Sequence, residues 1–170
     1  MMFGDWCAFH KRLAASLILL LASVCLAQEP QDKPSLGVLS VEFVPKITDA
    51  VQVELYTSVV RGTVVELARD SVDVIEGSKL DKLIQVNAVS CTSTDCLVQF
   101  AKKAQVDYLL ETRVIVHKGV YSVNMKLASS KSSSLLSEKT VTYGSEAEAQ
   151  KGLPTLSEAV VKSLAKNAHS

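Results

Sequence analysis

The sequence has no excess of either charge and few aromatic residues. Its 18 basic and 18 acidic residues cancel, aromatic residues make up 5% of the 170 positions, and there is one tryptophan. The lack of a basic excess argues against a dedicated nucleic-acid binder. Apolar residues, at 48%, are too few for a protein with several membrane spans and too many for a disordered chain. The length suits one globular domain.

Motifs for common catalytic and nucleotide-binding sites are also missing. The chain has no Gly-x-Ser-x-Gly elbow, no Gly-x-x-x-x-Gly-Lys loop and no Gly-x-Gly-x-x-Gly turn. Asp70, Asp73 and Glu76 lack the spacing of a calcium loop. His117 is expected at a hairpin tip, where a solvated polar residue is the simpler interpretation than a catalytic one. The sequence therefore predicts no enzyme, no metal and no cofactor.

Residues 1–27 are typical of a secretory signal peptide. A positively charged segment precedes the apolar run 13–22, and the small residues Cys25 and Ala27 occupy positions −3 and −1 of a cut before Gln28. The apolar run is too short to span a bilayer comfortably. We therefore expect cleavage, with an uncleaved anchor as the alternative.

Cys25 has a second interpretation, as the lipidated cysteine of a bacterial lipoprotein. Gly or Ala normally precedes such a cysteine, whereas Val24 precedes Cys25 here. The sequence thus favours a cleaved chain located in the periplasm or secreted. A lipid on Cys25 would instead attach it to the outer membrane.

Residues 28–34 are polar and contain proline, so a disordered lead-in is expected. Residues 35–167 are predicted to form a single α/β domain of mixed α+β character, in which helices pack on one mixed sheet. The predicted order is β-α-β-α-α-β-β-β-α. The elements are strand 35–44, helix 47–69, strand 72–75, helix 78–86, a helix after Cys96, strands 106–116, 121–127 and 135–143, and helix 145–167.

The apolar spacing of the first helix predicts which of its residues face the core. Steps of three and four give one helical face, and Asp49 supplies the N-cap. In the last helix, Pro154 is expected in the first turn of the main segment, where proline is tolerated. The predicted core face of the first helix consists of Val53, Tyr56, Val60, Val64 and Leu67.

Cys91 and Cys96 are the cysteines that remain after cleavage at Gln28. A disulfide is the natural state of such a pair in an oxidising compartment. Free thiols, a redox centre and a zinc site are the alternatives, but redox pairs usually enclose two residues and zinc needs three or four ligands. We predict a structural disulfide that contributes about 2 kcal/mol by the loop-closure model.

A characteristic order of short motifs begins at this cysteine pair. The pair is followed by Leu97, Phe100 and Ala101, then by Val106-Asp107-Tyr108-Leu109-Leu110, then by Gly119-Val120-Tyr121. This order resembles the bacterial periplasmic domains grouped with the TolB amino-terminal domain, the curli-secretion protein CsgG and the penicillin-binding-protein activator LpoB. The resemblance covers most of residues 35–166. It implies a TolB amino-terminal, anticodon-binding-like fold.

Two positions depart from the family pattern. Gln105 stands where the family usually has a helix-ending glycine, so the helix is expected to end differently. The family's Asp-x-x-Thr-Gly-Glu turn is replaced by the run Ser129-Ser130-Lys131-Ser132-Ser133-Ser134, and a looser loop is expected there.

These features favour an exported, non-enzymatic protein that binds other envelope proteins. The alternative is a CsgG-like subunit that self-assembles at the outer membrane as a homo-oligomer. An enzyme or small-ligand binder with a cleft at the sheet edge is a third hypothesis, for which no convergent polar groups are found. No nucleic-acid partner is expected. Contact with a membrane is expected only through the signal peptide or a lipid anchor. The exposed strands of the meander and the long first helix are the expected contact surfaces.

Overall fold

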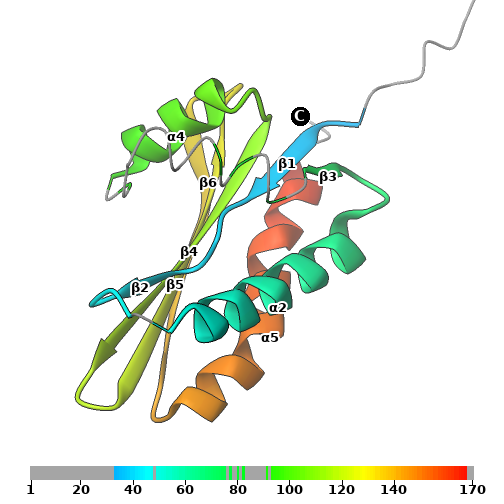
Figure 1. Cartoon of the computed structure of the whole chain (residues 1–170). Helices are drawn as coiled ribbons and strands as arrows, with labels where there is room; N and C mark the ends of the chain where they lie inside the picture. Colours follow the sequence, from blue (N-terminus) through cyan, green and yellow to red (C-terminus); the bar gives the residue numbers. More distant parts are fainter. Residues whose placement is uncertain are drawn as a thin grey trace, which may run out of the picture. The chain divides into compact units, whose positions relative to one another are not determined.

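The domain is a six-stranded mixed sheet with helices on both faces (Figure 1). The computed structural model describes residues 33–47, 49–75, 77, 80, 82, 91 and 93–167. The expected signal peptide, Cys25 and most of the predicted helix 78–86 lie outside the described residues. Within the described ranges, no helix combines the length and apolar character needed to cross a membrane.

The predicted α/β class and element order are confirmed. The strand order is β3-β1-β4-β5-β6, and β2 also pairs with β4. Pairings among β1, β2, β3 and β4 are parallel, whereas β4, β5 and β6 form an antiparallel meander. The elements are β1 (Ser35–Val38), β2 (Glu42–Val44), α2 (Ala50–Ala68), β3 (Asp73–Ile75), α4 (Thr94–Lys103), β4 (Tyr108–His117), β5 (Val120–Ser129), β6 (Ser134–Tyr143) and α5 (Glu146–Asn167).

The predicted single strand 35–44 is wrong in one respect, because it is interrupted between β1 and β2. Val38 pairs with Leu110 and Glu42 with Arg113, so the β1–β2 side holds one more residue than β4 between these pairs. An extra residue of this kind disrupts the ladder locally. The amide of Val41 instead donates to the Thr57 hydroxyl of α2, 3.0 Å away.

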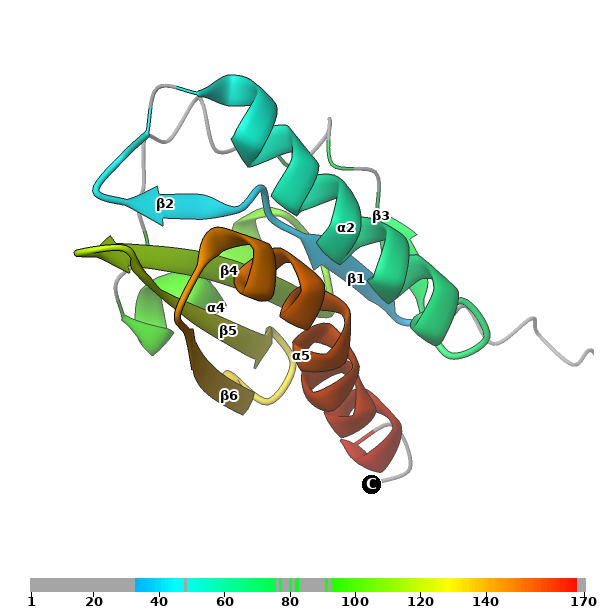
Figure 2. The same ribbon diagram turned by 90° about the horizontal axis from the view of Figure 1, so that it is seen from below.

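Alternation along β4 separates the two faces of the sheet. Helices α2 and α5 lie on one side of the sheet, which we call the helix-covered face, and α4 lies on the other, which we call the α4 face (Figure 2). Leu110 and Val114 belong to the core of the helix-covered face, and Leu109 belongs to the core of the α4 face. Each face has its own apolar core. The core of the helix-covered face includes Leu36, Phe43, Tyr56, Val60, Val64, Met125, Leu127, Leu153 and Val160, and that of the α4 face includes Leu80, Leu97, Phe100, Ala101, Val106 and Ala128.

Helix α2 begins at its predicted cap, since the Asp49 carboxylate accepts hydrogen bonds from the amides of Val51 and Gln52. Its predicted core face is confirmed at Tyr56, Val60 and Val64, and Val53 packs partly buried against the core. Leu67 is a correction, because 45% of its surface is exposed. The buried positions of α2 recur every four residues, and the next one after Val64 is Ala68 rather than Leu67.

Helix α5 corrects the position expected for Pro154. The proline lies inside a continuous helix rather than in a first turn. The helix starts earlier because the Ser145 hydroxyl accepts from the Glu148 amide, and the Glu148 carboxylate accepts from the amide of Gly144. This reciprocal capping fixes the start well before the proline.

Candidate interaction surfaces

The cysteine pair ties the chain before α4 to the first turn of that helix. Cys91 and Cys96 are joined by a disulfide, as predicted, with their Cα atoms 5.3 Å apart. Ser93 caps α4, and its hydroxyl accepts from the Cys96 amide at 3.2 Å. The helix therefore begins inside the cysteine loop rather than after it. Cys91 is buried, so the disulfide belongs to the apolar core of the α4 face.

The other end of α4 keeps a left-handed residue although no glycine is present. Gln105 has a φ of 55°, and its amide donates to the Lys102 carbonyl while the Val106 amide donates to the Ala101 carbonyl. This pair of bonds is the Schellman arrangement. The expectation that the helix would end differently is therefore wrong. The two backbone bonds and the burial of Val106 outweigh the cost of the left-handed conformation.

Asp107 connects the start of β4 to β1 and to the serine-rich turn. Its carboxylate accepts from the Ser35 amide at 2.7 Å and pairs with the Lys131 ammonium at 2.9 Å, and its carbonyl accepts from the Ser130 amide. Burial by itself raises the pKa of this carboxyl, but the bonds from Lys131 and Ser35 outweigh it and lower the pKa.

The turn between β5 and β6 is correspondingly tighter than expected. The sequence predicts a loose connector over 129–134, but the connection consists of residues 130–133 alone, because Ser129 is the last residue of β5 and Ser134 is the first residue of β6. Within the turn, Ser133 has a φ of 53° and the Ser132 amide donates to the Ser129 hydroxyl. Asp107 thus acts as a structural anchor for this turn.

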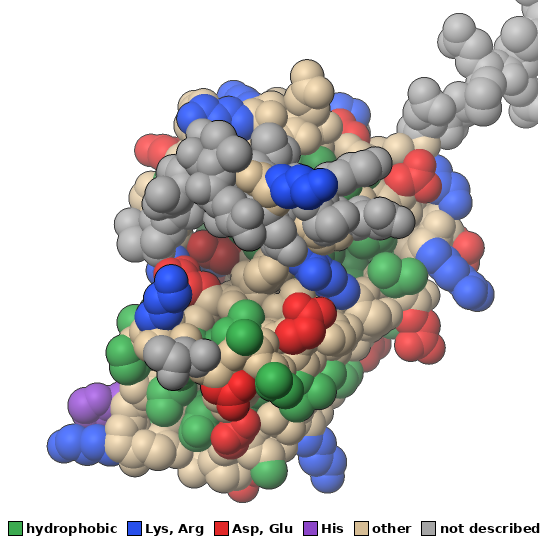
Figure 3. All heavy atoms as spheres, viewed as in Figure 1, with side chains coloured by type: hydrophobic (Ala, Val, Ile, Leu, Met, Phe, Trp, Pro, Cys, Tyr) green, Lys and Arg blue, Asp and Glu red, His purple; other side chains and the backbone are tan. Residues whose placement is uncertain are grey.

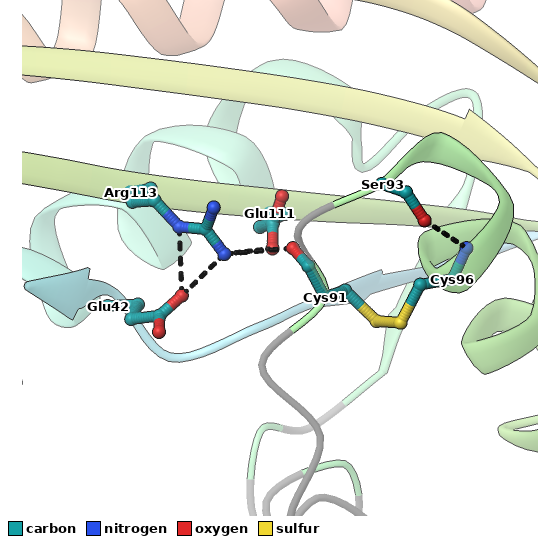
Figure 4. The surroundings of a disulfide bond; sticks show 6 residues. All are labelled: Glu42, Cys91, Ser93, Cys96, Glu111 and Arg113. Carbon is teal, nitrogen blue, oxygen red and sulfur yellow. Dashed lines mark hydrogen bonds and ion pairs between the residues drawn. A yellow bond between two sulfur atoms is a disulfide. The ribbon is translucent and has the colours of Figure 1, made fainter. Parts of the chain in front are cut away.

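A charged cluster lies on the α4 face next to the disulfide (Figure 4). Arg113 of β4 donates from Nε and Nη2 to the Glu42 carboxylate at 2.9 and 2.8 Å. The same Nη2 donates to the Cys91 carbonyl at 2.8 Å and lies 3.5 Å from the Glu111 carboxylate. The guanidinium therefore binds the cysteine segment to two strands of the sheet at once.

Glu111 is the most buried charge of this cluster, with 6% of its surface exposed. Burial raises the pKa of its carboxyl, and the charges of Arg113 and Lys126 oppose that effect without cancelling it. The next strands extend the polar surface, because Lys126 pairs with Glu138 at 3.6 Å and Asn124 donates to the Glu138 carboxylate. Among the described residues, no three His, Cys, Asp or Glu side chains gather in a way that could hold a metal ion.

Beyond the charged cluster, toward the β4–β5 hairpin, the α4 face carries exposed apolar side chains. Val44 and Ile115 are direct register partners and are 37% and 42% exposed. Val120 follows on β5, 41% exposed and on the same face, because it pairs with His117. We call Val44, Ile115 and Val120 the sheet-end patch.

A second exposed apolar surface runs along the outside of α2. Val51, Leu55 and Val65 are 78%, 47% and 46% exposed. Figure 3, seen from the same side as Figure 1, shows hydrophobic side chains interspersed with acidic ones along this helix. A hollow of about 280 Å³ lies at its N-terminal end, lined by Asp49, Val51, Gln52, Leu55, Glu146 and Gln150.

The other residues considered from the sequence as possible site residues do not belong to the sheet-end patch or to the exposed surface of α2. His117 is the exposed last residue of β4, and the turn beyond it consists of Lys118 and Gly119, both with positive φ, as type I′ hairpins require. Asp70 and Asp73 are exposed, and Glu76 and Cys25 lie outside the described residues.

Sequence reasoning missed the charged cluster. The prediction of a strand over 106–116 takes no account of Glu111 and Arg113, two charged residues that lie two positions apart within it. Two charges two residues apart on a strand point to the same face, and that spacing is the signal that could have revealed the cluster.

Comparisons with known proteins show the fold alone. No family model matches the chain, and no curated protein sequence is detectably similar to it. TolB from Acinetobacter baumannii superimposes with a TM-score of 0.51 at 11% identity, covering 79% of this chain and 29% of TolB. The likeness thus spans less than a third of that protein.

Two further solved structures are similar at lower scores. LpoB from Escherichia coli has a TM-score of 0.49 at 12% identity, covering 72% of this chain and 62% of LpoB. Lipoprotein GNA1162 from Neisseria meningitidis has a TM-score of 0.45 at 15% identity, covering 79% and 98%. Of the three likenesses, the one to TolB has a TM-score above 0.5, and it shows that the chain shares the fold of part of TolB.

Proposed function

We propose that this chain is an exported, non-enzymatic protein of the bacterial cell envelope that binds another envelope protein through the hairpin end of its α4 face. The observation that carries the proposal is the sheet-end patch, in which the register partners Val44 and Ile115 and their diagonal neighbour Val120 stay exposed on one face of three strands. The signal-like residues 1–27, the disulfide and the fold shared with part of TolB support the envelope location.

The patch has the composition of a small protein-binding surface. Protein interfaces have an apolar centre and a polar rim with hydrogen-bonding groups. Here the three aliphatic side chains are the centre, and the charged cluster at Glu42 with Asn124 on β5 forms the rim. Val44 and Ile115 are β-branched and therefore stiff about χ1, so they lose little side-chain entropy when a partner packs against them.

The polar groups beside the patch are occupied with structural contacts rather than arranged for chemistry. Arg113 contacts Glu42, Glu111 and the Cys91 carbonyl, which fixes the side chain in place. A general acid or base must reach a substrate, whereas Glu111 is buried against this guanidinium. The cluster therefore serves as a rigid support for the patch.

Position-specific photocrosslinking in intact cells tests the proposal. A photoreactive phenylalanine analogue at Ile115 should give a discrete adduct with another envelope protein, and Ile115→Lys should abolish co-purification of that protein. Val141 is the matched control, because it is similarly exposed, at 38%, yet pairs with the buried Val123 and so belongs to the opposite face. The same probe and the same Lys substitution at Val141 should have no effect.

Equal labelling from both positions, or no adduct from Ile115, would rule out the α4 face as the binding surface. Mass spectrometry of the processed N-terminus and cell fractionation test the location independently. A chain that starts at Gln28 supports the soluble exported form. An acylated Cys25 would establish the membrane-anchored form instead.

A further inference from the structure

The outer face of α2 carries a regular seam of exposed positions. These positions follow each other in steps of four and three, which is the spacing of the contact positions in paired helices. They lie opposite the buried row of Tyr56, Val60 and Val64. We call this set the outer seam, and it consists of Val51, Leu55, Ser58, Gly62 and Val65.

The centre of the outer seam is small and its flanks are larger. Ser58 and Gly62 are exposed, and a Cβ added at Gly62 would meet nothing within 4 Å. Leu55 and Val65 lie on either side of this small centre and are about half exposed. Small residues allow two helix backbones to approach closely, with the flanking aliphatic side chains in contact.

An acidic hollow lies at one end of the seam, and a basic side chain paired with an acidic one lies at the other. At the N-terminal end, the carboxylates of Asp49 and Glu146 line the hollow, and the six described residues around it include no basic side chain. At the C-terminal end, Arg69 lies directly after α2, four residues beyond Val65, and 74% of its side chain is exposed. It forms an ion pair with the Asp70 carboxylate, 4.0 Å away and itself 93% exposed, and the Lys33 ammonium donates to its backbone carbonyl.

We propose that the outer seam binds a second copy of this chain, with the two α2 helices antiparallel about a two-fold axis. In this arrangement Gly62 of one copy faces Ser58 of the other, and Leu55 faces Val65. Arg69 of each copy then reaches Val51 and the acidic hollow of the other. A two-fold contact must be self-complementary, and this order of small, aliphatic and oppositely charged positions meets that condition.

Charge decides between the two possible orientations. A parallel pair would place Arg69 beside Arg69 and hollow beside hollow, whereas the antiparallel pair joins unlike charges at both ends. The seam from Val51 to Val65 is about 21 Å long at the rise of an α-helix. A contact of this size is at the low end for stable interfaces, so the dimer should form at about micromolar or higher concentrations. The inference goes beyond the proposed function because it uses a different face.

Cysteine crosslinking tests the register. A mixture of exported Leu55→Cys and Val65→Cys chains should give a covalent dimer on mild oxidation, visible on a non-reducing gel. Each variant alone should not, because like positions are offset by ten residues, or about 15 Å along the helices. Absence of the mixed adduct, or equal adducts from each variant alone, would overturn the antiparallel register.

A substitution at Gly62 tests the contact without loss of the fold. Gly62→Glu fits the open space above the helix and replaces a poor helix former. We expect it to weaken self-association at least about tenfold in sedimentation equilibrium, with an unchanged or higher Tm. Ala159→Glu is the matched control, because Ala159 is an exposed position of α5, and it should leave the dimer intact. A wild-type chain that stays monomeric at high concentration, or a seam that crosslinks only to another protein, overturns the proposal.

Discussion

The two faces of the sheet differ in how the described helices cover them. On the helix-covered face, α2 and α5 enclose a continuous apolar core, whereas among the described residues the ten-residue α4, with Leu80, packs at one end of the other face. Consecutive residues of β4 show the consequence. The buried Thr112 hydroxyl faces the first core and has no hydrogen-bond partner among the described groups, while the buried Glu111 carboxylate on the other face has Arg113 beside it.

The largest effect should come from truncating the fully covered core. Leu110→Ala should lower the free energy of unfolding by about 4 kcal/mol, because rigid elements on all sides cannot close the cavity. Leu109, its neighbour on the opposite face, is equally buried, but α4 can shift toward it, so Leu109→Ala should cost about 3 kcal/mol. Urea denaturation measures both. A larger loss at Leu109 would contradict the difference in rigidity between the faces.

The next effect should come from the guanidinium of the charged cluster. Arg113→Met keeps most of the side-chain volume but leaves the buried Glu111 carboxylate and the Cys91 carbonyl without their donor. The expected loss of stability is about 3 kcal/mol. Lys126→Met removes a cation paired with the half-exposed Glu138 and should cost less than about 1 kcal/mol. Similar losses for the two variants would show that burial of the partner is unimportant.

The disulfide should contribute less than the guanidinium, because it closes a short loop. Replacing Cys91 and Cys96 together by serine should cost about 2 kcal/mol and should increase amide hydrogen exchange in α4 more than in α5. The intact exported chain should show no thiol that reacts with Ellman's reagent. Two reactive thiols, or equal loosening of both helices, would contradict a disulfide that stabilises only the α4 face.

Glu111 should make the free energy of unfolding depend on pH. Because its folded pKa is raised above the unfolded value, the folded state holds the proton more tightly, and this stabilisation is lost as the pH rises through the folded pKa. Glu111→Gln should therefore be more stable than wild type by about 1–2 kcal/mol at neutral pH. The difference should shrink below the ordinary glutamate pKa. Denaturation at several pH values measures it, and a gain that is constant with pH would exclude the carboxyl as its source.

The smallest effect should come from the hydroxyl on the helix-covered face. Thr112→Val keeps the shape of the side chain and removes the buried Oγ1 that lacks a partner. The expected gain is about 1 kcal/mol and independent of pH. A loss of stability would indicate that Thr112 has a bonding partner in solution.

Local signals in the sequence predicted much of the fold. Asp49 predicted the start of α2, the apolar spacing along α2 predicted its buried Tyr56, Val60 and Val64, and the two cysteines predicted their own pairing. Pro154 and Gln105 misled, because each has an unfavourable local preference that surrounding structure outweighs. Capping at Ser145 starts α5 ahead of Pro154, and two backbone bonds hold Gln105 in the left-handed conformation.

Neither candidate surface could be fully predicted. The long first helix was expected to make contacts, but its outer seam becomes visible only when the buried row is known. The sheet-end patch depends on the register that places Val44 beside Ile115. That register includes one extra residue between β1 and β2, which no local pattern indicates.

The α/β order and the disulfide follow from local patterns in the sequence, because each depends on residues close together in the chain. The export signal stays a prediction from the same kind of pattern. The tertiary structure decided which charges are buried and which aliphatic residues stay exposed. Glu42 meets Arg113 because parallel pairing of β2 with β4 brings together residues 71 apart in the sequence, and the Cys91 carbonyl reaches the same guanidinium from a loop 22 residues away. Burial depends on what covers a side chain, and here the cover comes from segments distant in sequence.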